Sequence, residues 1–221
     1  MQFLSANART TLSLIALCAG LATGPAMAQT MPIDPAPAAP HAVGDIDPVN
    51  DNAVFVFGGR FHTRYFQWGF VPFATNYEDN YILGAGYQHF FLNLDNDVRI
   101  GGEVGVAGRF GSDRPSGEIW AGIVTRYDGW TFDNIRISPS LTFGLSAETG
   151  TVGWEAHHEA EWSGGNAAVL FYLSPELNFS TADNPNVDFF WRIQHRSGAW
   201  GTLGNMGDGA NATTVGLRYH F

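Results

Sequence analysis

Apolar and polar residues alternate with a period of two along most of the chain from residue 53 to its end. This period is that of a β-strand, in which successive side chains point to opposite faces. Eight runs show it, over residues 53–62, 80–92, 98–109, 117–127, 135–148, 168–179, 187–196 and 211–221. Each is close to the roughly 9–11 residues that a tilted strand needs to cross a membrane.

The connections between these runs differ in length in a regular way. Three are short and rich in Asp, Asn, Gly or Pro, at residues 93–97, 128–134 and 180–186. The other four are mostly longer, at residues 62–79, 110–116, 149–167 and 197–210. Short periplasmic turns alternate with longer extracellular loops in this way in outer-membrane barrels. Residues 53–221 are therefore predicted to form an all-β domain, an eight-stranded antiparallel transmembrane β-barrel.

The end of the chain supports a barrel that sits in a bacterial outer membrane. The outward series of the last run is Val215, Leu217, Tyr219 and Phe221. A terminal aromatic residue after such alternation resembles the C-terminal signal strand of bacterial outer-membrane proteins. The alternatives are a soluble lipocalin-like barrel and a two-sheet sandwich, both of which would bury their apolar series inside.

Residues 1–28 read as a secretory signal peptide. They carry one cation, Arg9, then an apolar run, and end in the small-x-small cleavage site Ala26-Met27-Ala28. The alternative is lipidation at Cys18, which Leu17 disfavours because a small residue normally precedes that cysteine. Residues 29–52 are rich in proline and are predicted to form a disordered lead-in. Cys18 is the one cysteine of the chain, so the mature protein has neither disulfides nor thiolate sites.

The charges exclude one class of partner and suggest how the barrel is filled. The chain has eleven cations, all of them Arg, and a formal net charge of -10, so it has no basic patch for nucleic acid. Eight strands enclose an interior just wide enough for side chains. The charged residues expected to point inward are Arg99, Glu103, Glu118, Arg126, Arg136, Glu176, Arg192 and Arg218. These groups are expected to pair with one another and to plug the lumen, which argues against an open pore.

The most informative segment lies at the end of the seventh run. Phe189, Trp191 and Ile193 form its lipid-facing series, so the same parity places His195 and Ser197 on the outer wall. A serine hydroxyl is a weak nucleophile until an adjacent base takes its proton, and histidine is the natural base near neutral pH. A group attacked from this wall would belong to a lipid.

Simpler interpretations stand beside this one. A His and a Ser at a strand end also mark the interface where a strand leaves the bilayer. In the longest loop, five residues have a spacing that suits a metal ion but is more typical of a solvated loop edge: Glu155, His157, His158, Glu159 and Glu161.

Residues 187–221 resemble the C-terminal hairpin of the PagL family of outer-membrane lipid A 3-O-deacylases. The resemblance rests on His195-x-Ser197, on Gly198-Ala199, on the loop residues 204–209 and on the length of the last strand. It implies an eight-stranded barrel with a serine esterase site on the outside of the penultimate strand. Backbone amides of the loop that starts at Gly198 are then candidate oxyanion donors.

The third member of the site departs from the family pattern, which has an acidic residue early in the last strand. The corresponding residue here is Asn211, on the same parity as Thr213 and Val215. An asparagine can orient the histidine ring but cannot offset its positive charge. Asp208, three residues earlier, is a candidate to fold back into that role.

The predicted function is therefore removal of an ester-linked acyl chain from lipid A, with His195, Ser197 and Asn211 as catalytic residues. The partners are lipid A or lipopolysaccharide as substrate and the surrounding outer-membrane lipid, and no metal or cofactor is required. The sequence leaves a homodimer open. The alternatives are a non-enzymatic barrel that braces the membrane or presents loops, and a narrow channel or lipid-binding barrel.

Overall fold

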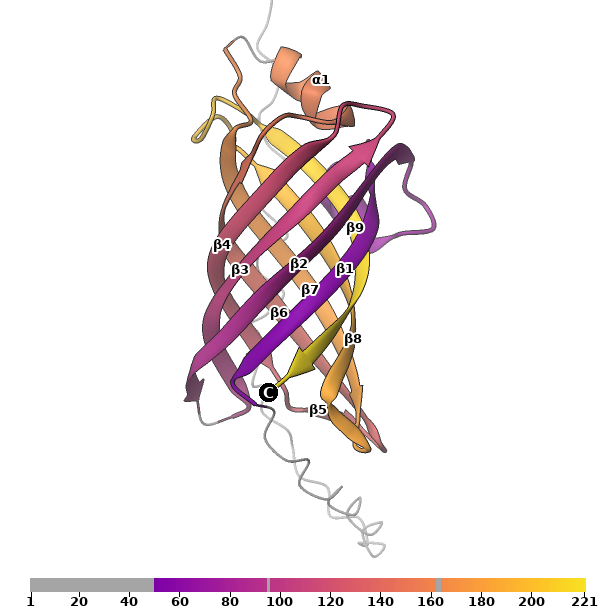
Figure 1. Ribbon diagram of the computed structural model, residues 1–221, viewed down its shortest axis with the longest axis vertical. Helices are drawn as coiled ribbons and strands as arrows, with labels where there is room; N and C mark the ends of the chain where they lie inside the picture. Colours follow the sequence, from indigo (N-terminus) through magenta and orange to yellow (C-terminus); the bar gives the residue numbers. More distant parts are fainter. Residues whose placement is uncertain (1–49, 95, 162–163) are drawn as a thin grey trace, which may run out of the picture. The chain divides into compact units, whose positions relative to one another are not determined.

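The structure is a computed structural model, and it describes residues 50–94, 96–161 and 164–221. Eight long strands form one closed antiparallel barrel in the order β4-β3-β2-β1-β9-β8-β7-β6, and β4 pairs with β6 to close it (Figure 1). They are β1 (Asn52–His62), β2 (Tyr77–Leu94), β3 (Val98–Gly111), β4 (Ser116–Tyr127), β6 (Ile135–Glu148), β7 (Val169–Thr181), β8 (Asn184–Ser197) and β9 (Asp208–His220). The predicted fold is confirmed.

Three short elements lie outside the barrel wall. The strand β5 (Trp130–Phe132) pairs only with the start of β6 in a tight hairpin. The 3-10 helix η1 (Phe66–Phe70) lies in the β1–β2 loop, and the helix α1 (Gly153–Glu161) lies in the β6–β7 loop. In the part of the chain that the structure describes, no helix is long and apolar enough to cross a membrane.

The strand bounds differ from the prediction mainly at the loop ends. β2 begins at Tyr77 and β9 at Asp208, each three residues before its predicted start. These extra residues find backbone partners in neighbouring strands, His62 for Tyr77 and Ser197 for Asp208. β1 begins at Asn52, which had been assigned to the lead-in. The signal peptide, and the lead-in as far as residue 49, lie outside the described residues.

The outer surface of the barrel is apolar along every long strand. Its exposed side chains include Val56, Leu83, Val106, Ile119, Phe143 and Leu217. A closed barrel satisfies all of its backbone groups between strands, which is what the interior of a bilayer demands. This surface places the barrel in an outer membrane and excludes the lipocalin-like and sandwich alternatives, which would hide these side chains.

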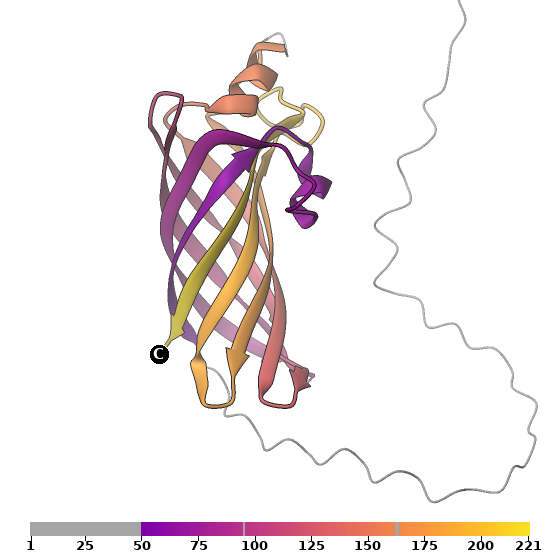
Figure 2. The same ribbon diagram turned by 90° about the vertical axis from the view of Figure 1, so that its right-hand side faces the viewer.

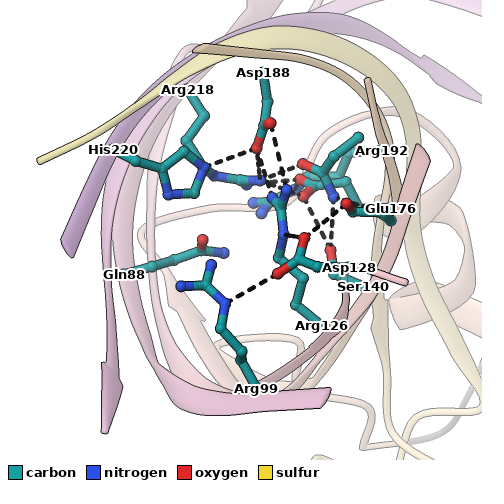
Figure 3. A network of polar contacts seen from close by, with 12 residues as sticks. Gln88, Arg99, Arg126, Asp128, Ser140, Glu176, Asp188, Arg192, Arg218 and His220 are labelled. Atoms are coloured by element: carbon teal, nitrogen blue, oxygen red, sulfur yellow. Dashed lines mark hydrogen bonds and ion pairs between the residues drawn. The ribbon is translucent and has the colours of Figure 1, made fainter. Parts of the chain in front are cut away.

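A network of ion pairs lies inside the barrel (Figure 3). Arg192 binds Glu103 at 2.8 Å and Glu176 at 2.7 Å. Asp188 accepts from Arg126 at 2.5 Å and contacts His220 at 2.8 Å. All eight charged residues predicted to face inward are buried. The expectation of a plugged, ion-paired interior is confirmed for the described residues, and it disfavours the channel interpretation.

Aromatic side chains separate this network from a second one above it. Phe55, Phe57, Trp120, Tyr172 and Phe190 belong to one buried cluster in the middle of the barrel. The indole ring of Trp120 packs against Gly105 of the neighbouring strand, where a Cβ atom would lie 2.1 Å from the ring. Because the barrel is narrow, the indole fits inside it only if the residue at this position has no side chain.

The helix α1 closes the loop end of the lumen, which the sequence did not predict. Glu155 is buried and pairs with both Arg109 and Arg196, and Glu148 binds Arg196 at 2.7 Å. The prediction of a solvated loop edge is therefore wrong for Glu155 and for His158, which are both buried, although His157 and Glu161 are exposed. The physical reason is that two buried guanidinium groups require a carboxylate, which the loop supplies.

Candidate active site

His195 and Ser197 lie on the outer wall of the barrel, as their parity predicts. Their neighbours Gln194 and Arg196 are buried in the lumen, where Arg196 donates to Ser146 at 2.7 Å. Across the wall, His195 pairs with Asn211 of β9, and Ser197 pairs with Asp208. All four residues lie at the loop end of the β8–β9 hairpin.

A β-bulge brings Asp208 to the same face as Asn211. Between the two pairs, β8 advances by two residues and β9 by three, so β9 carries one extra residue. Without the bulge, residues three apart would point to opposite faces. The sequence predicts Asp208 in the loop before the last strand, whereas the structure makes it the first residue of β9.

The three side chains form a hydrogen-bonded chain. The Asn211 amide nitrogen donates to Asp208 Oδ2 at 3.0 Å, and Asn211 Oδ1 lies 2.6 Å from His195 Nδ1. Asp208 Oδ1 is 3.6 Å from the same ring nitrogen. Because the carboxylate fixes the amide group, its oxygen faces the ring, and Nδ1 must carry the proton. The lone pair of His195 is then on Nε2, as a general base requires.

Ser197 makes its hydrogen bonds to the β8–β9 loop. Its hydroxyl donates to the Gly207 carbonyl at 2.9 Å and accepts from the Ala199 amide at 3.1 Å. Neither of these bonds is to His195, so the structure brings the serine to the site without the serine–histidine bond. A rotation about the serine χ1 angle, between staggered rotamers, would be needed to turn the hydroxyl away from Gly207.

The loop amides expected to stabilise an oxyanion are already in use. The Gly198 amide donates to the Gly207 carbonyl at 3.0 Å, and the Ala199 amide is bound to Ser197. The loop is also tight at Gly198, where a Cβ atom would lie 2.1 Å from the Met206 carbonyl oxygen. Glycine is therefore needed here for close backbone approach rather than for a free donor.

The helix η1 lies on the outside of the barrel near its loop end (Figure 2), where it contacts β8 and β9. The Phe66 ring lies 4.7 Å from the His195 ring, centroid to centroid, and Phe70 lies 6.3 Å from Trp191. Gly69 packs on Ile193, and His195 is only 8% exposed. We call the segment Phe66–Phe70 the aromatic lid. The sequence analysis missed it, although the density of aromatic residues between 61 and 73 was a signal.

His62 is a further residue of this wall that the sequence analysis missed. It is the last residue of β1 and pairs with Tyr77 on one side. On the other side, the pairing of β1 with β9 ends at Phe61 and Ala212. Continued by one residue, this register brings His62 beside Asn211, and Tyr77, His62, Asn211 and His195 then form one row across four adjacent strands.

The helix α1 reaches the same corner of the barrel. The Tyr65 ring stacks on His158 with 6.4 Å between centroids, and His158 interacts with the backbone of Asp208. Burial lowers the pKa of His158, while the nearby Glu161 carboxylate opposes that shift. Within the described ranges, no group of three or more His, Cys, Asp or Glu side chains is arranged to hold a metal ion.

Comparison with known proteins agrees with the fold. No family model matches the chain, and no curated protein matches it. Among solved structures, the outer membrane enzyme PagL is 15% identical, with 76% of this chain and 98% of that chain covered and a TM-score of 0.52. The Neisserial surface protein A is 13% identical, with 79% and 100% covered and a TM-score of 0.47. The chain thus has the fold of the eight-stranded outer-membrane barrels.

Proposed function

We propose that this barrel is a serine esterase of the outer membrane that removes an ester-linked acyl chain from lipid A. The observation that carries the proposal is the chain Asp208–Asn211–His195 on the outer wall, next to Ser197. An acid, a polar link and a histidine in this order are the parts that activate a serine hydroxyl. The resemblance of the His195-x-Ser197 segment to the lipid A deacylases supports the same chemistry.

The proposed mechanism is acyl transfer to water. Ser197 Oγ attacks the ester carbonyl carbon while His195 Nε2 takes the hydroxyl proton. The imidazolium then gives this proton to the leaving alkoxide, and the acyl group stays on Ser197. A water molecule, deprotonated by the same nitrogen, releases the fatty acid and restores the hydroxyl. The Asn211 oxygen and the Asp208 carboxylate stabilise the transient positive ring.

The position of the site supports a lipid substrate. His195 and Ser197 continue the outward series Phe189, Trp191 and Ile193, at the end of the strand where the long loops lie. The aromatic lid covers Ile193, so the first two residues of the series are the ones that face lipid. An ester bond between a polar headgroup and an acyl chain lies at that depth of the outer leaflet. Such a lipid reaches the site by lateral diffusion, without passing through the filled lumen.

A second candidate is a barrel without enzymatic activity that presents its loops to partners. Two observations favour it: the Ser197 hydroxyl is bound to Gly207, and the aromatic lid covers His195. In a barrel of this kind, both polar residues would only stabilise the strand end. The two candidates differ in what they expect of Ser197.

Mass spectrometry of lipid A from a host that expresses the chain separates them. We expect wild type to lose one acyl group, and Ser197→Ala and His195→Ala to leave lipid A intact. Thr213→Ala, on the same outer face but away from the hydrogen-bonded chain, is the matched control and should behave as wild type. Folding of each variant is checked by its heat-dependent gel mobility. Intact lipid A from a folded wild-type barrel would favour the second candidate.

A further inference from the structure

We propose that His62 is a substrate-binding residue of this exterior site and donates a hydrogen bond to an oxygen of the lipid headgroup. The inference rests on the proposed esterase function and adds the recognition of the headgroup to it. His62 comes from β1, the strand that follows β9 around the barrel, and so from the other end of the sequence. Its place in the row with Asn211 and His195 follows from the strand register.

The imidazole of His62 is buried without proper hydrogen bonds. It is 1% exposed, and neither ring nitrogen is hydrogen-bonded to a side chain of the described residues. Its one polar neighbour is the backbone of Arg64, which makes at most a weak contact with the ring. Tyr77 offers only the edge of its ring, 6.4 Å away between centroids. A buried polar group without a partner is costly, and proteins keep few of them.

His62 also lies beside the candidate site, because its strand β1 is next to β9 and β9 is next to β8, which carries His195. Asn211, between them, uses its side-chain amide for Asp208 and its oxygen for His195. His62 differs from Asn211 and His195 in that its ring makes no side-chain hydrogen bond among the described residues.

The spacing of the strands indicates what His62 would contact. Neighbouring strands lie about 4.8 Å apart, so His62 and His195, two strands apart, are separated by roughly 10 Å along the wall. A lipid whose ester carbonyl lies at Ser197 would place its headgroup, rather than the ester itself, over His62. The outward side chain two residues before it is Arg60, whose guanidinium stacks on Tyr77 at 5.7 Å. The same guanidinium pairs with Asp79 at 2.7 Å, so the surface carries both charges and suits a sugar oxygen.

A lipid bound at this site has to move the aromatic lid. The β1–β2 loop, which carries the lid, begins directly after His62, and the lid covers His195. A lipid that displaces the lid would reach the acyl-transfer residues and His62 in one movement. The headgroup oxygen then supplies the hydrogen bond that the closed loop does not.

The test compares His62→Phe with a matched control, His89→Phe, in the Ser197→Ala background. Phenylalanine keeps the size of the ring and removes its donors. His89 lies on β2 near the turn end of the barrel, far along the wall from the site, and pairs with Asn52. Binding of purified lipid A is measured in detergent micelles by isothermal titration calorimetry, and barrel stability by the unfolding midpoint in denaturant.

We expect His62→Phe to weaken lipid A binding by about tenfold, the loss of one hydrogen bond to a buried donor. Its unfolding midpoint should be unchanged or higher, because an unsatisfied polar group has been replaced by an apolar one. His89→Phe should bind as the background does. Unchanged binding in His62→Phe would overturn the inference, as would a fall in stability that accounts for the loss.

The same variants separate this inference from the proposed function. If the protein with Ser197 does not hydrolyse lipid A, but His62→Phe still weakens lipid A binding, the esterase proposal fails and the proposed role of His62 in binding is supported. If wild type hydrolyses lipid A and His62→Phe alone leaves KM unchanged, the esterase stands and the inference about His62 fails.

Discussion

Exchanging the acid and the amide of the site tests the central feature of the proposed mechanism. In the double variant Asp208→Asn, Asn211→Asp, a carboxylate would take the place of the Asn211 oxygen, 2.6 Å from His195 Nδ1. In wild type the Asn211 amide donates to the Asp208 carboxylate at 3.0 Å. In the double variant the amide at position 208 would instead donate to the carboxylate at position 211. The hydrogen-bond count and the ring tautomer are preserved, and the position of the negative charge changes.

The expected gain follows from two distances. The carboxylate now lies 3.6 Å from Nδ1 and would move to 2.6 Å. With an effective dielectric constant of about 20, the attraction to an imidazolium grows by about 2 kcal/mol. Only the transition state and the intermediates carry that positive charge, so kcat should rise by roughly twentyfold.

The single variants should behave differently from the pair. Asp208→Asn removes the charge and frees the Asn211 amide to turn, which admits the wrong tautomer, and we expect a loss of about a hundredfold or more. Asn211→Asp alone sets two carboxylates at about the present 3.0 Å separation, where they must share a proton and cannot give the full gain.

Hydrolysis of a micellar fatty-acid ester, followed by fatty-acid release, gives kcat for all four proteins. Nitrogen NMR of the histidine ring gives the tautomer of His195 independently of turnover. Asp208 does not act on His195 through Asn211 if the folded Asp208→Asn variant keeps the wild-type kcat. The same conclusion follows if His195 of wild type carries its proton on Nε2. A double variant slower than wild type would show that the geometry, rather than the charge, sets the rate.

Three further predictions concern the surroundings of the site. Phe66→Ala should speed the modification of His195 by diethyl pyrocarbonate several-fold, because it uncovers the ring, while Phe73→Ala, fully exposed already, should not. Glu155→Gln should lower the unfolding free energy in detergent by about 3 kcal/mol, since it leaves Arg109 and Arg196 short of a carboxylate; Glu161→Gln is the exposed control. Because the pKa of His158 is lowered in the folded state, the unfolded state binds more protons, and the docking of α1 should weaken as the pH falls below about 6.5. Hydrogen exchange of α1 at pH 5 and pH 8 measures this, and His158→Gln should remove the difference.

The number of strands and the direction of most side chains could be predicted from the order of residues alone. Strand geometry alternates faces residue by residue, so the patterns that gave Arg192 to the lumen and His195 to the outer wall needed no knowledge of distant segments. The same local rule separated the ion-paired interior, with Glu103 and Glu176, from the lipid-facing surface. Eight runs of suitable length fixed the number of strands for the same reason.

The positions of Asp208, His62 and the aromatic lid around His195 could not be predicted from the sequence, because they depend on contacts between distant segments. The bulge that turns Asp208 outward depends on how β8 and β9 align, and the place of His62 depends on the closure of β1 against β9. The lid over His195 and the plug at Glu155 come from loops whose packing is set by what they meet. These contacts join residues that are far apart in the chain. The register of the strands that carry them is set when the whole barrel closes, and a local pattern of apolar and polar residues does not contain that information.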